Sequence, residues 1–244
     1  MKNYRKLLAG SLALLLAVGI TGCSNTSGGG TGVANEDGLV VLNVASTGQP
    51  VSFDPADANL VVNEYTEYDC YDTLLDFNQD GTDVVPALAE SWEQVDDLTY
   101  TYKIREGVKF SDGSDLTMDD VLYSLNRVRE DAYGMSYLFE HVDSFEVDEK
   151  TRTLTVHLTQ PDSTWKYVPA TTPCQILKKS VVEAEGDAYG TNEGSVVGTG
   201  PYKFVSWAAD SQIVLEKNEY WWGGADNLAI DKINFYVMKD ASTI

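Results

Sequence analysis

Apolar and polar residues alternate regularly over residues 98–105. A period of two places successive side chains on opposite faces, so this segment is predicted to form a half-buried strand. Val108 and Phe110 continue the apolar face after a turn at Glu106 and Gly107. The residues expected to face inward from the strand are Leu98, Tyr100, Tyr102 and Ile104.

A turn and then an amphipathic helix are predicted next. Asp112 and Gly113 favour a tight turn, because glycine adopts the positive φ that other residues disfavour. Thr117 and Asp120 have the spacing of a capping box, in which each side chain accepts a hydrogen bond from the main-chain N–H of the other residue. Apolar residues then recur at helical spacing, which predicts a helix with one buried face. These residues are Val121, Leu125, Val128 and Ala132.

The rest of the chain alternates between short apolar segments and turn residues, which indicates a mixed α/β fold. Strands are expected over 39–45, 145–147, 154–158, 202–207, 213–215 and 230–238, and helices over about 60–75 and 180–185.

The N-terminus has the pattern of a secretory signal. Lys2, Arg5 and Lys6 precede an apolar run at 7–20. This run is shorter than the ~20 residues that a membrane span needs. A buried core helix is the alternative, but such a helix would have a polar face, and this run has none.

The signal ends in Ile20-Thr21-Gly22-Cys23, which resembles the lipobox of bacterial lipoproteins. The resemblance implies a signal peptide over 1–22, lipid attachment at Cys23 and a flexible tether over 23–38, whose stretch NTSGGGTG is rich in glycine. A diacylglyceryl group supplies the two acyl chains that stable anchoring requires. The alternative is an ordinary cleavable signal that leaves Cys23 as a free thiol.

Composition narrows the classes of function. The chain has 244 residues, 43% of them hydrophobic, which suffices for one large or two ordinary domains. It carries 38 Asp and Glu against 17 Lys and Arg. This acidic balance argues against a nucleic-acid partner, because phosphates require a basic surface.

Two further cysteines, Cys70 and Cys174, leave two alternatives open. In an exported protein they could form a disulfide, which would close a long loop. They could equally be two buried thiols that remain unpaired.

Motifs for metal or nucleotide binding are incomplete. Residues 76–81 match the first half of a calcium loop, but the twelfth position holds Ala87 where a bidentate glutamate is required. A hairpin turn is therefore favoured there. Residues 198–200 form a lone G-x-G without the remaining features of a phosphate-binding loop, so they too predict a turn.

No catalytic or metal-ligand pattern is present. His141 and His157 share no ligand spacing with each other or with the cysteines. No nucleophile, base and orienting residue stand at a recognisable spacing, which weighs against a secreted hydrolase with paired carboxylates. We therefore expect no enzyme activity, no cofactor and no metal site.

Four ordered blocks of sequence resemble the family 5 extracellular solute-binding proteins, which are the oligopeptide, dipeptide and nickel receptors of ABC importers. The blocks are PALAESWE at 86–93, LTYTYKIREGVKFSDGSDLTMDDVLYSLNR at 98–127, VGTGPYKF at 197–204 and LEKNEYWWGG at 215–224. The resemblance covers most of 39–244, and its middle block is the most specific because its order and spacing extend over a long span.

The resemblance implies the fold of a periplasmic-binding-protein-like type II lobe with an inserted mixed α/β domain. The first lobe would comprise 39–57 and 174–244, and the insert would comprise 58–173. The chain stops without a closing helix, so we expect it to be the front part of a longer protein whose second lobe is missing. Because closure around a ligand requires both lobes, this part alone is expected to bind only weakly.

The implied function is that of a lipoprotein that captures peptides between two lobes and delivers them to a permease. In peptide-binding relatives the ligand lies extended against main chain, which provides affinity without reading side chains. The matching segment here comprises Thr47, Gly48, Gln49, Pro50 and Phe53.

Expected partners are a peptide, the ABC permease subunits and the lipid bilayer through acylated Cys23, with the protein a monomer at the outer face of the cell membrane. An oligosaccharide, chelated nickel or haem is an alternative ligand within the same family, and sensing of a peptide pheromone is an alternative role.

Overall fold

The fold is that of a computed structural model, which describes residues 33–34, 38–55, 69–130 and 135–238. The chain divides into two units, 1–31 and 32–244, and all the described residues lie in the second. Strands and short helices alternate along this unit, so the prediction of a mixed α/β fold is confirmed.

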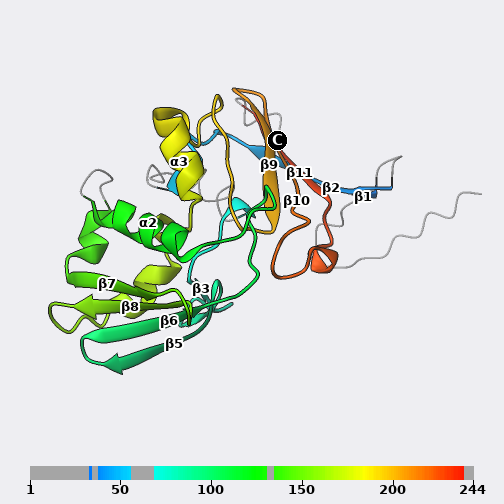
Figure 1. The fold of residues 1–244 in the computed structure, drawn as a ribbon. Coiled ribbons are helices and arrows are strands. Elements are labelled where there is room, and N and C mark those ends of the chain that lie inside the picture. The colour runs from blue at the N-terminus through cyan, green and yellow to red at the C-terminus, as the bar shows by residue number, and fades with distance from the viewer. Residues whose placement is uncertain (1–32, 35–37, 56–68, 131–134, 239–244) are drawn as a thin grey trace, which may run out of the picture. The chain divides into compact units, whose positions relative to one another are not determined.

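A five-stranded sheet joins the beginning and the end of the described chain (Figure 1). Its strand order is β1-β2-β11-β10-β9. The strands are β1 (Val33–Ala34), β2 (Val40–Ser46), β9 (Tyr202–Ala208), β10 (Gln212–Lys217) and β11 (Lys232–Val237). β2 and β11 pair in parallel, and the other pairs are antiparallel. The strands predicted over 39–45, 202–207, 213–215 and 230–238 are therefore confirmed, each within two residues at its ends.

A four-stranded antiparallel sheet occupies the middle of the chain, with the strand order β5-β6-β8-β7. Its strands are β5 (Ala89–Asp96), β6 (Thr99–Ile104), β7 (Val142–Asp148) and β8 (Thr153–Leu158). Tyr100, Tyr102 and Ile104 are buried, as their alternation predicts. Leu98 is an exception at 38% exposed, because β6 begins one residue later and Leu98 lies in the turn before it.

The helix α2 (Met118–Arg129) begins at the predicted capping box. Asp120 N–H donates to Thr117 Oγ1 at 3.1 Å, and Thr117 N–H donates to Asp120 Oδ2 at 3.0 Å. Val121, Leu125 and Val128 are buried in the same core as the four-stranded sheet. Ala132, the last residue of the predicted stripe, lies outside the described residues.

The helix predicted over 60–75 lies largely outside the described residues, and its end at Leu75 is wrong. Asp69 and Cys70 are helical, whereas Leu75 belongs to β3 (Leu75–Phe77), which pairs with β4 (Val84–Pro86). The helical spacing of apolar residues is overridden here by hairpin pairing, since Leu74 O also accepts hydrogen bonds from the N–H groups of Ala87 and Ala89.

The half-matched calcium loop is the turn of this hairpin, as predicted. Asn78 Oδ1 accepts hydrogen bonds from the N–H groups of Thr82 and Asp83 at 2.8 and 3.2 Å, which closes the loop.

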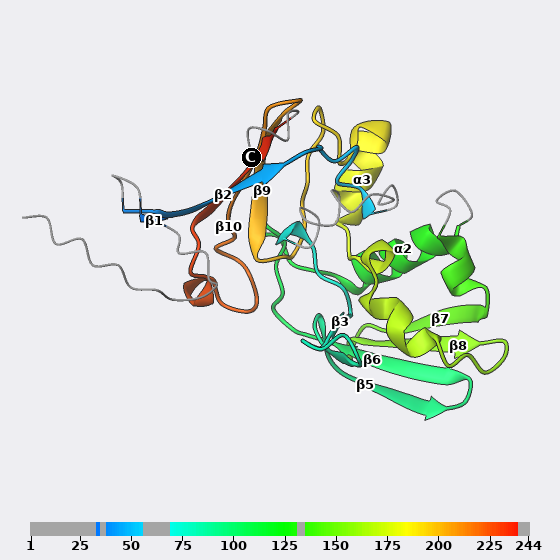
Figure 2. The same cartoon turned by 180° about the vertical axis from the view of Figure 1, so that it is seen from behind.

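Short helices complete the unit (Figure 2). α3 (Lys179–Glu185) confirms the helix predicted at 180–185, and the 3₁₀ segments are η2 (Ser136–Phe139), η3 (Trp165–Ala170), η4 (Thr172–Cys174), η5 (Gly186–Ala188) and η6 (Ala225–Asn227). Of the two alternatives for Cys70 and Cys174, the structure has no disulfide between them, and both side chains are buried. In the part of the chain that the structure describes, no helix is long and apolar enough to cross a membrane.

Candidate functional site

One edge of β2 is open in the described structure. Val40 O and Ser46 O accept hydrogen bonds from the N–H groups of Asp231 and Met238, at the two ends of β11. Main-chain groups of a strand alternate between its two edges, so the odd-numbered residues of β2 face away from β11. β1 pairs with β2 only at residues 40 and 41. The N–H and C=O groups of Asn43, Ala45 and Thr47 therefore face an edge that carries no other described strand, and all three residues are exposed.

The predicted ligand segment continues directly from this edge. Thr47 is exposed and Gly48 is half-buried. Ser46 Oγ donates to Gly48 O at 2.7 Å, which turns the chain at the strand end. Gln49 Oε1 accepts a hydrogen bond from Asp210 N–H in the β9–β10 turn at 2.6 Å, so this side chain fixes the segment in place.

The far end of the segment is part of the core. Pro50 is buried, and Phe53 is completely buried, with its ring 5.2 Å from that of Phe204 and 5.8 Å from that of Trp207. Phe53 N–H donates to Gly190 O at 2.7 Å. The structure thus keeps the five predicted residues in one segment, but of the five only Thr47 is exposed, while Gly48 and Gln49 are half-buried and Pro50 and Phe53 are buried. Whether these residues touch a ligand stays a prediction.

An ion pair connects this segment to α2. Arg127 Nη1 and Nη2 donate to Asp54 Oδ1 and Oδ2 at 2.6 and 2.5 Å, and the two side chains are only 13% and 9% exposed. A planar two-point pair of this kind holds both partners in a fixed orientation. It borders a pocket of about 460 Å³ that Tyr123, Tyr189 and Thr191 also line.

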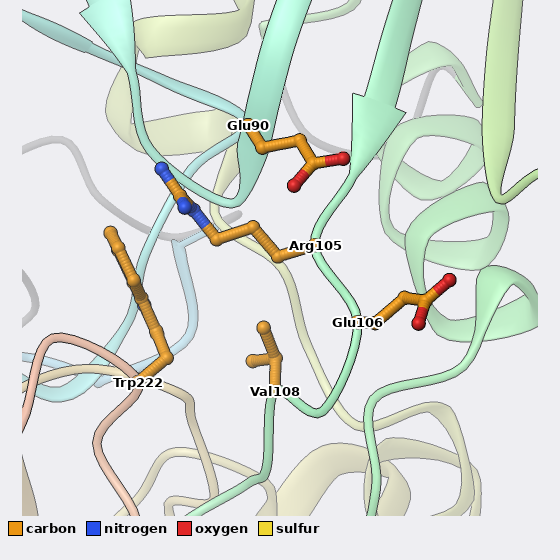
Figure 3. A pocket seen from close by; sticks show the side chains of 5 residues that line it. All are labelled: Glu90, Arg105, Glu106, Val108 and Trp222. Atoms are coloured by element: carbon orange, nitrogen blue, oxygen red, sulfur yellow. The ribbon is translucent and has the colours of Figure 1, made fainter.

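A second pocket, of about 450 Å³, lies where Arg105 meets Trp222 (Figure 3). The Arg105 guanidinium carbon lies 4.6 Å from the centre of the Trp222 ring, and Arg105 Nε donates to Ala87 O at 2.6 Å. Figure 3 shows the guanidinium between the Trp222 ring and Glu90, while the Glu106 carboxylate points away. The indole face is already covered by Arg105, so this pocket offers charged groups rather than an open aromatic surface.

The same tryptophan reaches a half-buried carboxylate. Trp222 Nε1 and Thr199 Oγ1 both donate to Asp72 Oδ2 at 2.9 Å. Burial raises the pKa of Asp72 to about 6, and these two hydrogen bonds act in the opposite direction.

The G-x-G motif at 198–200 positions Thr199 for its hydrogen bond to Asp72. A Cβ on Gly198 or Gly200 would lie within 2.5 Å of the main chain of Cys70, so both positions require glycine for close packing. The turn brings Thr199 against Asp72.

Sequence reasoning missed several of these residues. It did not single out Asn43, Ala45, Asp72 or Arg105, and it included Trp222 only as part of the block at 215–224. The alternation at 39–45 indicates which face of β2 is exposed, because Asn43 and Ala45 are the less apolar positions of that strand, but it carries no signal for an open edge. No local pattern indicates Asp72, whose partners lie more than a hundred residues away.

The sequence is similar to those of proteins that are named for binding peptides. A dipeptide-binding protein of Bacillus subtilis, DppE, is 29% identical over 264 residues, a match that takes in all of this chain and 48% of that protein. The dipeptide-binding protein of Escherichia coli is 31% identical over 228 residues, covering 82% of this chain and 41% of that protein. The chain thus spans less than half the length of these relatives.

The fold is also shared. The Haemophilus influenzae protein OppA in complex with the peptide RPPGFSPFR superposes with a TM-score of 0.74 at 26% identity, over 86% of this chain and 44% of that one. The oligopeptide-binding protein AppA of Bacillus subtilis, in complex with a nonapeptide, gives 0.73 at 27% identity, over 83% and 41%. The fold is that of a type II periplasmic binding protein, and the matched share of these proteins fits one lobe with its insert.

The sequence profile of the bacterial extracellular solute-binding proteins, family 5 Middle, matches residues 83–244. This range contains all four blocks in full, at 86–93, 98–127, 197–204 and 215–224. The chain belongs to the bacterial extracellular solute-binding proteins of family 5.

Proposed function

We propose that this chain is the N-terminal part of a receptor that captures peptides and delivers them to a membrane permease of an ABC importer. The family consists of solute-binding proteins, and relatives in it are named for binding dipeptides and oligopeptides. The observation that carries the proposal is the open edge of β2, where the main chain of Asn43, Ala45 and Thr47 is paired with no other described strand.

An extended peptide fits this edge by strand addition. Its own N–H and C=O groups would pair with those of the three residues, so affinity would depend little on the peptide's side chains. The turn at Ser46 and Gly48 and the anchored Gln49 hold the strand end rigidly, which reduces the ordering cost of binding.

A main-chain substitution tests this mode of binding. Ala45→Pro removes one N–H from the open edge, where proline is tolerated because no ladder bond is lost. We expect peptide affinity of the receptor that contains this chain to fall about tenfold, in line with one hydrogen bond lost at a desolvated site. Calorimetry with a mixture of short peptides measures the change.

Ala45→Val is the matched control, since it changes the side chain and keeps the N–H. Its affinity is expected to stay within twofold of the unmodified receptor. Equal affinities for the proline and valine variants would contradict strand addition at this edge. Turnover of labelled peptide, or co-purification of a single oligosaccharide, chelate or haem, would contradict the proposed function itself.

We infer two regions in the described unit, with 39–57 and 174–244 in the first lobe and 58–173 in the insert. Two separate cores support this division. One contains Phe53, Tyr71 and Leu177, and the other extends from Leu74 to Ile176. Along the chain, the buried residues pass from one core to the other between Tyr71 and Leu74, which is later than the inferred boundary between 57 and 58.

Lipid attachment at Cys23 explains how the receptor stays near its permease, at the outer face of the membrane. The residues concerned, 1–22 as signal, Cys23 and the tether to 38, lie almost entirely outside the described residues, and their support is the sequence alone. Cys23→Ala is expected to abolish incorporation of radioactive palmitate in cells, whereas Cys70→Ala retains it. Labelling of the Cys23→Ala variant would contradict the anchor.

A further inference from the structure

A small cavity opens beside the Asp72 carboxylate, in a part of the molecule distinct from the β2 edge. Its volume is about 60 Å³, which is room for one small ion together with water. The residues that line it are Tyr71, Asp72, Thr73, Asp76, Ala87 and Gln175.

Main-chain hydrogen bonds fix the walls of this cavity. Ile176 N–H donates to Asp72 O at 2.9 Å, which sets Gln175 beside Asp72. Leu88 N–H donates to Thr73 O at 3.1 Å, which holds the chain after the β3–β4 hairpin against the same segment. The cavity is therefore enclosed by three segments whose relative positions are set by backbone contacts.

The Asp72 carboxylate has a free oxygen at this cavity. Its two described hydrogen bonds, from Thr199 and Trp222, both reach Oδ2, so Oδ1 has no hydrogen-bond partner among the described residues. Both donors are neutral. A half-buried carboxylate without a cationic partner is unfavourable, and proteins compensate such a charge with an ion pair or a metal ion.

The side chain of Gln175 is a second, independent indication that the cavity holds a bound ion. Its side chain is 1% exposed, and neither Oε1 nor Nε2 has a hydrogen-bond partner in the described structure. Leaving both ends of a buried amide without partners costs on the order of a few kcal/mol. An occupant that coordinates Oε1, and whose bound water meets Nε2, removes that cost.

A second carboxylate stands at the mouth of the cavity. Asp76 is exposed, and its Oδ1 accepts a hydrogen bond from Phe77 N–H at 2.7 Å, which leaves Oδ2 for a further contact. The lining residues include no lysine, arginine or histidine, and neither aspartate forms a salt bridge within the part of the chain that the structure describes.

From these contacts we propose that the cavity binds one calcium ion, held by Asp72 Oδ1, Asp76 Oδ2, Gln175 Oε1 and water. All three protein ligands are oxygen atoms, which hard cations prefer, and the two carboxylates match a double positive charge. Zinc is disfavoured because no histidine or cysteine lines the cavity. The ligands come from residues 72, 76 and 175, so no local spacing in the sequence indicates the site.

Only two carboxylates contribute, and no cluster of three or more His, Cys, Asp or Glu side chains occurs among the described residues. The affinity therefore belongs to the weak range of calcium sites, with Kd of about 10⁻⁴ to 10⁻³ M. Such a site is filled outside the cell, where calcium is abundant.

Terbium luminescence tests the proposal directly. Tb³⁺ replaces Ca²⁺ at oxygen sites and emits when a nearby tryptophan is excited, and the Trp222 indole is hydrogen-bonded to Asp72. We expect the full chain to show sensitised emission that Ca²⁺ displaces, and a melting temperature that rises as Ca²⁺ is added at constant ionic strength.

Variants assign the ion to this cavity. Asp76→Asn retains an acceptor for Phe77 N–H, so it is expected to fold, and it should weaken Ca²⁺ binding at least tenfold. Gln175→Leu should also weaken it, by about tenfold. Asp80→Asn is the matched control, because it removes the same charge from an exposed position of the same hairpin, and its affinity is expected to stay within twofold.

Two outcomes would overturn the proposal. One is an unchanged melting temperature and no displaceable emission at 10 mM Ca²⁺, which would leave water as the occupant. The other is equal weakening by Asp76→Asn and Asp80→Asn, which would show that Ca²⁺ binds diffusely to the acidic surface.

Discussion

Single residues show which features of this protein follow from local sequence. The alternation at 98–105 correctly predicts that Tyr100 and Tyr102 are buried, and the spacing of Thr117 and Asp120 predicts their reciprocal hydrogen bonds. Both patterns involve residues only a few positions apart, so the interactions that they predict can be inferred from local sequence. The contacts of Asp72 are different, because its partners are brought to it only by the complete fold.

Burial should make stability depend on the protonation of Asp69. Burial raises the pKa of this carboxyl to about 7 from its ordinary value of 3.8. The folded protein therefore binds the proton more tightly than the unfolded chain. It follows that the contribution of Asp69 to the free energy of unfolding is present below about pH 4 and is lost as the pH rises toward 7.

Asp69→Asn removes the titrating carboxyl group, so the variant does not lose stability as this group ionises. The free energy of unfolding of the variant minus that of the unmodified protein should therefore increase from pH 5 to pH 8. Urea titrations at the two pH values measure it, with Asp80→Asn as the exposed control. A difference that is the same at both pH values would contradict the assignment.

The buried thiols should be unreactive in the folded protein. Burial raises the pKa of Cys174 to about 12, although its contact with the Thr171 hydroxyl acts in the opposite direction. The reactive thiolate is therefore scarce at pH 8. We expect iodoacetamide to modify Cys174 and Cys70 only after denaturation, as detected by mass spectrometry. Failure of both to react in denaturant without a reducing agent would indicate a disulfide instead.

Among helices and strands, the sequence patterns failed where pairing between distant segments determined the secondary structure. Leu75 is the last residue of the predicted helix at 60–75. It lies in a strand instead, because the β3–β4 hairpin and Leu74 provide main-chain partners. Similarly, the length of β2 was predicted well, but its open edge depends on how far β1 extends along it. Register and pairing partners are set by the whole sheet and have no local signal.

The ion pair between Asp54 and Arg127 should hold the segment after β2 against α2. Arg127→Met leaves the buried Asp54 carboxylate without this partner, so we expect a loss of about 3 kcal/mol in the free energy of unfolding. Denaturant titration measures it.

Adding Asp54→Asn to that variant removes the unpaired charge and should recover part of the loss. A double variant as unstable as the sum of the two single variants would show that the pair has no coupling and would contradict this role.

At the scale of the whole molecule, strand order could not be predicted from local patterns. β2 and β11 are the first and last long strands that the structure describes, and they pair in parallel across nearly two hundred residues. Only the resemblance to the solute-binding family indicated such a discontinuous arrangement, because a family likeness carries information about the complete fold. The family and fold were accessible in this way, whereas the cavity beside Asp72 was not, since it depends on side chains that the resemblance does not specify.

Addition of a peptide as a strand to β2 can be measured by amide hydrogen exchange. In the receptor that contains this chain, residue-resolved exchange is compared with and without bound peptide. We expect peptide to slow exchange at Asn43, Ala45 and Thr47, whose amides face the open edge, and to change it little at Leu42 and Val44, which face β11. Unchanged exchange at all three odd-numbered positions under saturating peptide would contradict strand addition at β2.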